Sequence, residues 1–328
     1  MMKVGIVGAT GAVGRQMISC LKERNMDVEE LRAFASSSSV GKTIDFKGND
    51  VIVQEVSDGC FDSLDYVLGA VGNELSKQYW PLIEKAKAVY VDNSSAFRME
   101  KDVPLVVPEI NGEDALKHKG LIANPNCSTI ITMMAVAPIN RLSKIRYMYV
   151  STYQAVSGAG IKGFEELEEQ IEKLKNNESF EPKVFRKQIA FNCIAEIGSY
   201  LDNGYTSEEM KMQNEGSKIL HLPELKVSCT CVRVPVYRSH AISVDLVTQE
   251  ELDLKDVRKA IDEFENVEYR DDIPTQAEVS DKDIVYVGRL RKDLCNNKGI
   301  NLWCCGDQIR KGAATNAVEI IEYLEKHK

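Results

Sequence analysis

The sequence predicts an α/β protein of two domains, the first doubly wound around a parallel sheet and the second α+β with a mixed sheet. Three observations support this class. A glycine-rich turn at residues 8–14 joins a short apolar run to a helical pattern. Apolar runs and helical patterns then alternate as far as residue 123, as in parallel sheets covered by helices. Beyond Cys127 the runs alternate in polarity, which is typical of a sheet with one exposed face.

Composition narrows the class of protein. The chain has 328 residues, a net charge of −9 and no apolar run of the roughly 20 residues that span a membrane. The negative charge argues against a nucleic-acid partner. Nine cysteines lack metal-finger spacing, so we expect no metal site and a reducing compartment. A strand pattern starts at Lys3 and leaves no room for a signal peptide, so a cytoplasmic enzyme is expected.

The first motif is Gly8-Ala9-Thr10-Gly11-Ala12-Val13-Gly14, between an expected strand at 3–8 and an expected helix at 15–24. This order opens a Rossmann unit, in which glycines let the backbone approach a pyrophosphate on the helix N-terminus. The spacing G-x-x-G-x-x-G is less strict than the usual fingerprint. A tight turn without a ligand is the alternative.

A serine loop follows the expected second strand, residues 31–35. It reads Ser36-Ser37-Ser38-Ser39-Val40-Gly41-Lys42 and lacks the acidic residue that commonly holds an NAD ribose. Hydroxyls, backbone amides and a lysine suit a 2′-phosphate better, which favours NADP. The alternative is a flexible serine linker.

Further buried strands are expected at residues 65–72, 88–92, 103–107 and 120–123, with a helix at 76–87. A polar loop, residues 93–98, follows one of these strands at the edge where α/β folds place ligands. Arg98 in this loop is either an anion clamp or an ordinary solvated arginine. The residues alone favour the second interpretation.

The rest of the chain is organised around Asn124-Pro125-Asn126-Cys127-Ser128-Thr129, which leads into an apolar helical pattern. A thiol at a helix N-terminus is stabilised as thiolate by the helix dipole and unpaired N–H groups. We expect Ser128 or Thr129 to cap that helix. The alternative is a structural cysteine that acts as a small hydrophobe.

The second domain contains more alternating strands and helices. Strands are expected at 145–156, 227–237, 241–250, 285–290 and 300–305, and helices at 163–175, from 206 or 207, at 254–264 and at 312–328. Residues 176–187 read as irregular. The closing helix has an apolar face that we expect to pack on the first domain. The expected boundaries are therefore 1–126, joined by about 311–328, and 127–310.

Few residues can serve as a base for Cys127. The chain has four histidines, and His240, between two expected strands, is the best placed. A lone histidine is more often structural. Glu208 and Lys211 lie three apart on one helix face, where a surface ion pair is the simple interpretation.

Taken together, the motifs resemble the aspartate-semialdehyde dehydrogenase family over nearly the whole chain. Besides the glycine and cysteine motifs, four segments carry the resemblance, namely Tyr153–Gly160, Glu208–Lys211, Cys231 through His240, and Gly312–Val318. The resemblance implies a Rossmann NADP-binding domain and a catalytic and dimerisation domain. It also implies a homo-oligomer, either dimer or tetramer.

The resemblance assigns roles to individual residues. Cys127 is implied as the nucleophile, His240 as general acid/base, and Gln154 as the group that orients the substrate. The substrate and phosphate ligands implied are Arg233 for the distal carboxylate, Glu208 for the amino group, Arg98 and Lys211 for phosphate, and Asn126 beside the cysteine. The implied cofactor ligands are Gly8, Thr10, Gly11, Ala12, Val13, Ser36, Ser38, Ser39, Gly72, Ser157, Gly158, Gln308 and Asn316.

The implied reaction is NADPH-dependent reductive dephosphorylation of L-aspartyl 4-phosphate to L-aspartate 4-semialdehyde through a Cys127 acyl-thioester. It serves lysine (through diaminopimelate), threonine and methionine biosynthesis. The family commonly carries an arginine in the serine loop, where this chain has Ser38. NADP stays favoured because no acidic residue replaces that arginine, and use of NAD is left open.

Two rival interpretations remain. N-acetyl-γ-glutamyl-phosphate reductase shares the thioester chemistry, but its cysteine motif usually has glycine before the cysteine and Tyr-Pro-Thr after it. Asn126 and Ser128-Thr129 differ from that pattern. A non-catalytic paralogue of the fold is expected to lose the thiol or the base, and this chain keeps Cys127 and His240. A metal-dependent hydrolase lacks clustered ligands.

Overall fold

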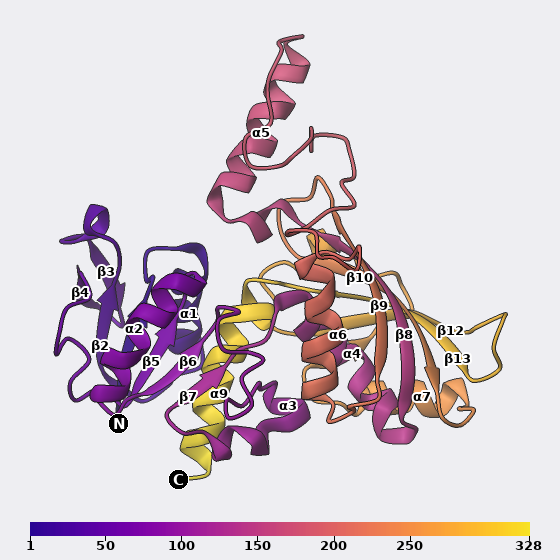
Figure 1. The fold of residues 1–328 in the computed structure, drawn as a ribbon, viewed down its shortest axis with the longest axis horizontal. Helices are drawn as coiled ribbons and strands as arrows, with labels where there is room; N and C mark the ends of the chain where they lie inside the picture. Colours follow the sequence, from indigo (N-terminus) through magenta and orange to yellow (C-terminus); the bar gives the residue numbers. More distant parts are fainter. The chain divides into compact units, whose positions relative to one another are not determined.

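A computed structural model describes residues 1–328, and the chain divides into two compact units (Figure 1). The N-terminal unit comprises Met1–Asn126 and Gly312–Lys328, and the second unit comprises Cys127–Lys311. Each unit is built on one main sheet with helices packed against it. The predicted α/β class is confirmed.

The N-terminal unit has a seven-stranded sheet in the order β3-β4-β2-β1-β5-β6-β7. All neighbouring pairs are parallel except β3 with β4. Crossing from β1 to β2 on one side and to β5 on the other is the doubly wound order that a Rossmann unit requires. The strands are β1 Met2–Val7, β2 Val28–Phe34, β3 Thr43–Phe46, β4 Asn49–Gln54, β5 Tyr66–Gly69, β6 Val89–Asp92 and β7 Leu121–Ala123.

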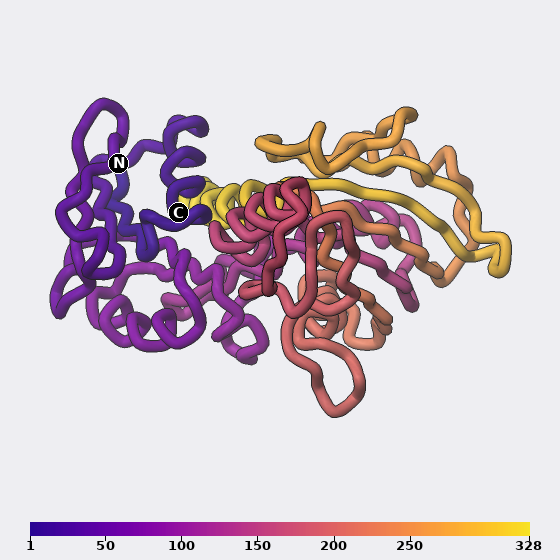
Figure 2. Tube along the Cα trace, turned by 90° about the horizontal axis from the view of Figure 1, so that it is seen from above, coloured from indigo at the N-terminus to yellow at the C-terminus, as the bar shows by residue number.

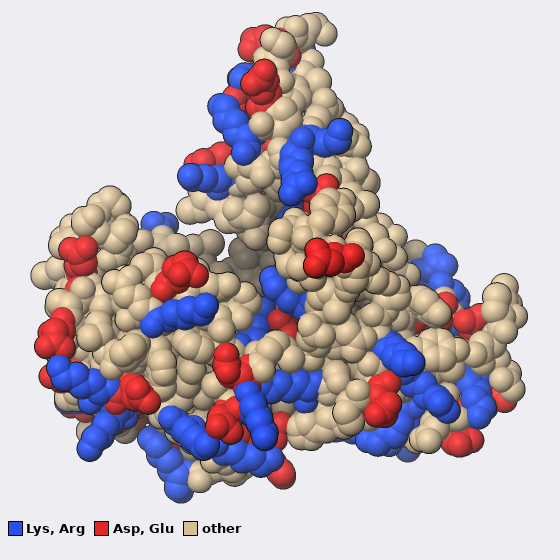
Figure 3. Space-filling view, in the orientation of Figure 1, with Lys and Arg blue, Asp and Glu red and all other residues tan.

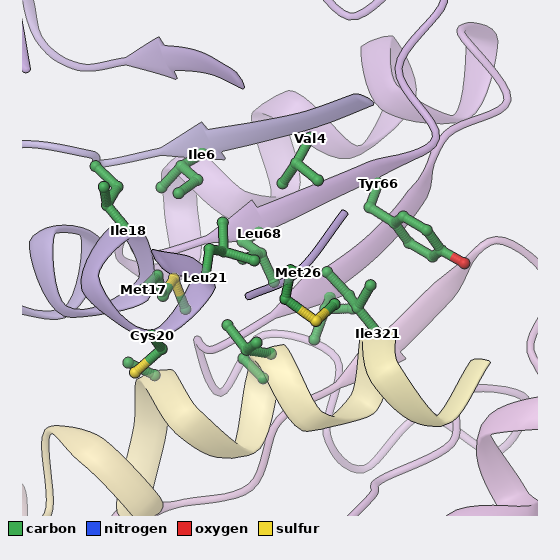
Figure 4. Close-up of a cluster of buried hydrophobic side chains, with 14 of the residues drawn as sticks. Val4, Ile6, Met17, Ile18, Cys20, Leu21, Met26, Tyr66, Leu68 and Ile321 are labelled. Carbon is green, nitrogen blue, oxygen red and sulfur yellow. The ribbon is translucent and has the colours of Figure 1, made fainter. Parts of the chain in front are cut away.

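Helices cover both faces of this sheet. One face packs against α1 (Ala12–Glu23) and the closing helix α9 (Thr315–Lys326), with Met17, Leu21 and Ile321 in the shared core (Figure 4). The other face packs against α2 (Asn73–Lys85). Successive strand residues alternate between the two cores, because side chains alternate across a strand. The remaining short helices are η1 Ser37–Ser39, α3 Pro108–Asn111 and η2 Gly112–Lys117.

The second unit has a six-stranded mixed sheet in the order β11-β12-β13-β10-β8-β9. The pairs β8–β9 and β11–β12 are parallel and the other pairs are antiparallel. Figure 2 shows the antiparallel β12 and β13, in orange and yellow, running side by side. The strands are β8 Ile145–Gln154, β9 Lys226–Arg233, β10 His240–Thr248, β11 Val267–Tyr269, β12 Val285–Lys292 and β13 Gly299–Gly306.

One face of this second sheet is covered by helices. These are α4 (Cys127–Leu142), α6 (Ser207–Ile219) and α7 (Leu254–Asp262). The opposite face carries exposed side chains such as Tyr149. Helix α5 (Ile161–Lys175) packs with residues 185–194 around a small core of its own, which contains Leu167 and Ile189. Short helices η3 Val156–Ala159 and α8 Gln276–Val279 complete the unit.

Several local features differ from the sequence-based expectation; one is the strand expected at 227–237, which ends at Arg233. Residues 103–107 form no strand, and only Leu105 makes a single bridge, to Ala123. The hairpin β3–β4 was missed because Lys47-Gly48 is a weaker turn signal than Asn-Gly; both residues have positive φ. The closing helix begins with a π-helical turn, Arg310–Ala314, and is α-helical only from Thr315.

On the face drawn in Figure 3, acidic and basic residues are interspersed, and neither sign forms an extended field. None of the helices combines the length and the apolar character that a membrane crossing requires.

Candidate active site

Cys127 is the first residue of α4, a helix that is buried along almost its whole length. The expected cap was wrong. Because the helix starts at the cysteine, Ser128 and Thr129 lie inside its first turn and do not precede it. The thiol therefore sits directly at the positive end of a 16-residue helix. This is the position in which a thiolate gains most from the unpaired backbone N–H groups.

Three of the predicted site residues share one row across the second sheet. Gln154 at the end of β8 pairs with Arg233 at the end of β9 and with His240 at the start of β10. Residues 233 and 240 are seven apart in sequence, and Gln154 is far from both. The sheet register brings them together, and all three side chains are buried.

His240 faces the thiol. Its Nε2 lies 3.5 Å from Cys127 Sγ, and the Ala155 N–H donates to its Nδ1 at 3.2 Å. Complete burial and the positive charge of Arg233 lower the pKa of His240 to about 3. The imidazole is therefore neutral at physiological pH. Because Nδ1 accepts a hydrogen bond, the ring proton lies on Nε2, toward the sulfur.

Gln154 is oriented by its neighbours. Its Oε1 accepts from the Thr152 hydroxyl at 2.9 Å, and its Nε2 donates to Glu208 Oε1 at 3.3 Å. The same Nε2 lies 3.5 Å from His240 Nε2. The side-chain amide is thus held next to the thiol and imidazole pair, where it can contact a bound acyl group.

Glu208 lies in the first turn of α6, and Lys211 follows three residues later on the same helix. Lys211 Nζ donates to Glu208 Oε2 at 2.7 Å, and Glu208 is buried. The simple expectation of a surface pair therefore underestimated its burial. A capping box of Thr206 with Glu209 fixes this helix start, and Glu209 Oε1 also accepts from the Cys231 N–H at 3.0 Å. Glu209 ties α6 to β9 and was missed as a positioning residue.

Arg233 is held against the turn that follows β8. Its Nη1 donates to the Ala155 carbonyl at 2.5 Å. Burial lowers the pKa of Arg233, while the Glu208 charge opposes that shift. A Cβ on Gly158 would stand 2.7 Å from Arg233 Nη1, so only glycine allows this approach. Phe185 lies beside the guanidinium, with its ring centre 5.9 Å from Cζ.

The N-terminal unit contains the glycine loop. Gly8 has φ +81°, and a Cβ there would lie 2.3 Å from the Ala70 carbonyl oxygen. A Cβ on Gly14 would lie 2.2 Å from the Gly8 oxygen, so that glycine allows α1 to pack closely on β1. Gly11 precedes α1 and provides no side-chain cap for its first N–H groups. These features match a pyrophosphate site at a helix N-terminus.

The serine loop lies against this turn. Thr10 Oγ1 donates to Ser39 Oγ at 3.4 Å, and Lys42 Nζ reaches the same hydroxyl at 3.5 Å. Ser36 and Ser38 are exposed, with their hydroxyls 3.1 Å apart. Hydroxyl groups and a lysine are therefore gathered where the second strand ends.

The polar residues at the ends of β6 and β7 form one network. Arg98 is buried and donates to the carbonyls of Asn93 and Asn124, at 2.8 and 2.9 Å. Asn316 Nδ2 donates to Asn124 Oδ1, whereas the buried Asn316 Oδ1 has no hydrogen-bond partner. An acceptor left open in a buried position suits the carboxamide of a nicotinamide. Asn126 is buried immediately before α4.

Two other predicted cofactor ligands, Gln308 and Gly72, lie in different units of the chain. Gln308 Nε2 donates to Ser157 Oγ at 2.6 Å, and its Oε1 accepts from the Ser239 N–H at 2.6 Å. The nitrogen and the oxygen of this side-chain amide are therefore both hydrogen-bonded to residues of the second unit. Gly72 precedes α2, and a Cβ there would meet open space. The structure thus gives Gln308 a positioning contact beside His240.

Two family models match the chain. The semialdehyde dehydrogenase NAD binding domain matches residues 3–118, and the semialdehyde dehydrogenase dimerisation domain matches residues 136–311. The first match supports a nicotinamide cofactor for the N-terminal unit.

Characterised relatives agree with these matches. An aspartate-semialdehyde dehydrogenase of Bacillus subtilis is 42% identical, over 99% of this chain and 98% of its own. The aspartate-semialdehyde dehydrogenase 2 of Vibrio cholerae is 46% identical, over 98% and 97%. The crystal structure of aspartate semialdehyde dehydrogenase II from Vibrio cholerae superimposes with a TM-score of 0.97 at 45% identity and covers 99% of both chains. Since family models, relatives and a solved structure agree over nearly the full length, this chain is an enzyme of the aspartate-semialdehyde dehydrogenase family.

Proposed function

We propose that the enzyme catalyses NADPH-dependent reductive dephosphorylation of L-aspartyl 4-phosphate to L-aspartate 4-semialdehyde through an acyl-thioester on Cys127. The observation that carries the proposal is the cysteine at the first position of α4, 3.5 Å from a buried, neutral imidazole. Aspartate semialdehyde dehydrogenase II from Vibrio cholerae, 44% identical in sequence, has been crystallised in complex with ASA. That complex supports a small aldehyde as the ligand of this site.

In the acylation step, the Cys127 thiolate attacks the acyl carbon, a C–S bond forms, and the C–O bond to phosphate breaks. Cys127 reacts as the thiolate, having released its proton to solvent, and the phosphate group leaves with the electron pair of the broken C–O bond. The N-terminal N–H groups of α4 stabilise the thiolate. Gln154, held by Thr152 and Glu208, can donate to the acyl oxygen as it becomes an oxyanion.

A reduced nicotinamide, when bound, supplies the hydride that reduces the thioester carbon. The tetrahedral alkoxide accepts a hydrogen bond from the Nε2–H of His240 and then collapses. On collapse the C–S bond breaks, the aldehyde forms, and Cys127 leaves as the thiolate. The neutral state of His240 suits this role, because its Nε2–H can stabilise the negative oxygen by a hydrogen bond until collapse.

Substrate recognition uses the charged residues around the sheet row. Arg233 is proposed to bind the distal carboxylate, because a planar guanidinium matches a carboxylate in a bidentate geometry. Glu208 is proposed to bind the amino group. Lys211, Arg98 and Asn126 are proposed to hold the phosphate. Lys211 in its observed position is paired with Glu208, so binding of phosphate redistributes that ion pair.

The proposed cofactor is NADP. Its support is the cluster of Ser36, Ser38, Ser39 and Lys42 beside the glycine turn, and the absence of an acidic residue there. NAD remains an alternative because the loop has Ser38 where the family commonly has arginine. The residues proposed to hold the cofactor are Gly8, Thr10, Gly11, Ala12, Val13, Ser36, Ser38, Ser39, Gly72, Ser157, Gly158, Gln308 and Asn316.

The domain roles belong to the same proposal. Residues 1–126 with the closing helix bind NADP, and residues 127–310 carry catalysis and assembly. We propose a homo-oligomer formed through the second unit, whose sheet has on one face exposed side chains such as Tyr149, beyond the part covered by α8. Nine free cysteines are typical of a reducing compartment, so a cytoplasmic location is included, as is a role in lysine, threonine and methionine biosynthesis.

The test is phosphate-dependent reduction of NADP⁺, and separately of NAD⁺, with L-aspartate semialdehyde and with N-acetyl-glutamate semialdehyde. We expect activity with the first aldehyde only, and preferentially with NADP⁺. Comparable rates with NAD⁺ would replace strict NADP use by dual use. Activity with the second aldehyde would favour the N-acetyl-γ-glutamyl-phosphate reductase alternative. Absence of activity with both aldehydes would contradict the proposed reaction.

A further inference from the structure

We propose that Gln276 is a positioning residue of the active site, whose single side-chain amide aligns the strands that carry Gln154 and His240. The inference rests on the proposed function, because it takes those two residues to be part of the catalytic machinery. Gln276 belongs to none of the motifs that predict the active site; it is the first residue of α8 and follows the N-cap residue Thr275.

The amide of Gln276 bridges two strands. Its Nε2 donates to the Tyr153 carbonyl at 3.0 Å and to the Ser239 carbonyl at 2.8 Å. Tyr153 is the residue before Gln154, and Ser239 is the residue before His240. A primary amide has two N–H groups, so it can give one to each carbonyl. One side chain thus fixes both backbones one residue away from the proposed catalytic groups.

The Gln276 bridge lies at the edge of the sheet where β8 ends and β10 begins. β8 finishes at Gln154 and β10 begins at His240, and these two residues are register partners. Residue 239 already lies outside the ladder, so it lacks the regular strand hydrogen bonds that hold residues farther along β10. A bridging amide at this edge supplies the alignment that the missing ladder does not.

Ser239 needs such support because of its backbone. Its φ is +72°, a left-handed conformation that residues other than glycine rarely adopt. The residue is fully buried and is held at every polar group. Its N–H donates to Gln308 Oε1 at 2.6 Å, its carbonyl accepts from Gln276, and its hydroxyl lies 2.9 Å from the Ser280 hydroxyl.

The Gln276 bridge affects the distances between the side chains of the proposed catalytic residues. His240 Nε2 lies at that distance from both Cys127 Sγ and Gln154 Nε2. The direction of the His240 ring depends on the backbone of residues 239 and 240, and that of Gln154 on residues 153 and 154. Loss of the Gln276 bridge frees both backbones to move. Displacement of catalytic groups by about 1 Å can cost about a hundredfold in rate.

The test is Gln276→Met, which keeps the chain length and removes both donors. We expect kcat to fall by about ten- to a hundredfold while KM for the aldehyde changes by less than about twofold, because the Arg233 contacts remain. Gln213→Met is the matched control. The side-chain amide of Gln213 also makes two hydrogen bonds to backbone, donating to the Leu225 carbonyl and accepting from the Val227 N–H. These contacts lie at the start of β9, the end of the strand away from Arg233. Its loss should lower thermal stability and leave kcat unchanged.

A second variant guards against loss of folding. Ser239→Gly takes the positive φ without strain, which offsets part of the loss of the hydroxyl contact with Ser280, so the protein should still fold, and kcat should fall because the backbone before His240 is less restrained. The effect of Gln276→Met is then measured in a His240→Asn background. If Gln276 acts through His240, the additional loss of kcat shrinks to less than about threefold.

Wild-type kcat in both Gln276→Met and Ser239→Gly would overturn the inference, and the same fold loss with and without His240 would overturn the part of it that concerns His240. A rise confined to KM would also contradict it, because that pattern belongs to substrate binding. These outcomes are separable from failure of the proposed function. If Cys127→Ser is inactive while Gln276→Met is like wild type, the thioester reaction stands and only the positioning role of Gln276 is wrong.

Discussion

Gln154 and His240 are register partners across the β8–β10 pair, and their side-chain nitrogens lie 3.5 Å apart on the buried face of the sheet. The strand order places Arg233 in the same row on the other side of Gln154. The proposed acid/base, the orienting amide and the carboxylate clamp are therefore arranged by backbone hydrogen bonds. Rigid strands position such groups more accurately than loops do.

The first prediction concerns the nucleophile. Cys127→Ser should lower turnover by at least about 10⁴-fold, because a hydroxyl at this position is a far weaker nucleophile than a thiolate. Binding of NADP, followed by isothermal titration calorimetry, should be unchanged. Cys193→Ser, at an exposed cysteine, is the control and should keep full activity. Turnover that survives in Cys127→Ser would contradict the thioester mechanism.

Gly158→Ala should impair substrate binding. The added methyl group would stand 2.7 Å from Arg233 Nη1 and has to displace that flexible guanidinium. We expect KM for L-aspartate semialdehyde to rise by about tenfold or more, with little change in the melting temperature. In an Arg233→Lys background the alanine should add little. An unchanged KM in Gly158→Ala would show that Arg233 is not the carboxylate ligand or that it accommodates the methyl group without loss.

The buried His240 predicts a specific pH dependence of stability. Its folded-state pKa of about 3 lies below the ordinary value of 6.5, so the unfolded chain binds the proton more readily. The contribution to stability is fully present above pH 6.5 and is lost as the pH falls from 6.5 toward 3. The slope is about 1.4 kcal/mol per pH unit for one group. The measurement is urea unfolding of wild type and His240→Gln between pH 7 and 4.5. The free energy of unfolding of the wild type should fall more steeply with decreasing pH than that of the variant, which lacks the histidine.

Glu166 should be important for stability of the segment after α5. Its carboxylate is buried and accepts from the backbone N–H groups of Lys183, Val184 and Phe185, as well as from the Gln170 amide. Glu166→Gln turns one acceptor into a donor that faces these N–H groups, which should cost about 1–3 kcal/mol in the free energy of unfolding. Glu169→Gln, an exposed position on the same helix, should have no measurable effect. Equal stabilities of the two variants would contradict the assigned role.

Ser38 tests the cofactor preference. Ser38→Asp places a negative charge in the exposed part of the serine loop, where the 2′-phosphate is proposed to bind. KM for NADP⁺ should rise by about tenfold or more through charge repulsion, and KM for NAD⁺ should stay the same or fall. Ser38→Ala separates the charge from loss of the hydroxyl. If Ser38→Asp affects both cofactors equally, the 2′-phosphate does not lie beside Ser38.

Much of the fold was predictable because its signals are local. The glycine loop, the apolar runs of β1, β5 and β6 and the amphipathic helices α1 and α2 each lie within a short window of sequence. The errors were also local. Leu105 makes one bridge where a strand was expected, and α4 starts at Cys127, one residue before the expected cap.

The sequence by itself determined the fold class, the family resemblance and the identity of the residues that can carry the chemistry, because motif order and residue type are properties of the chain. Tertiary structure decided how those residues meet. The shared row of Arg233, Gln154 and His240 comes from the pairing of three strands. The neutral state of His240 comes from burial, and the contacts of Gln276 come from an amide of a distant segment that reaches two strand ends. Register, burial and long-range side-chain contacts depend on which segments pair in space, and a single sequence read locally does not contain that information.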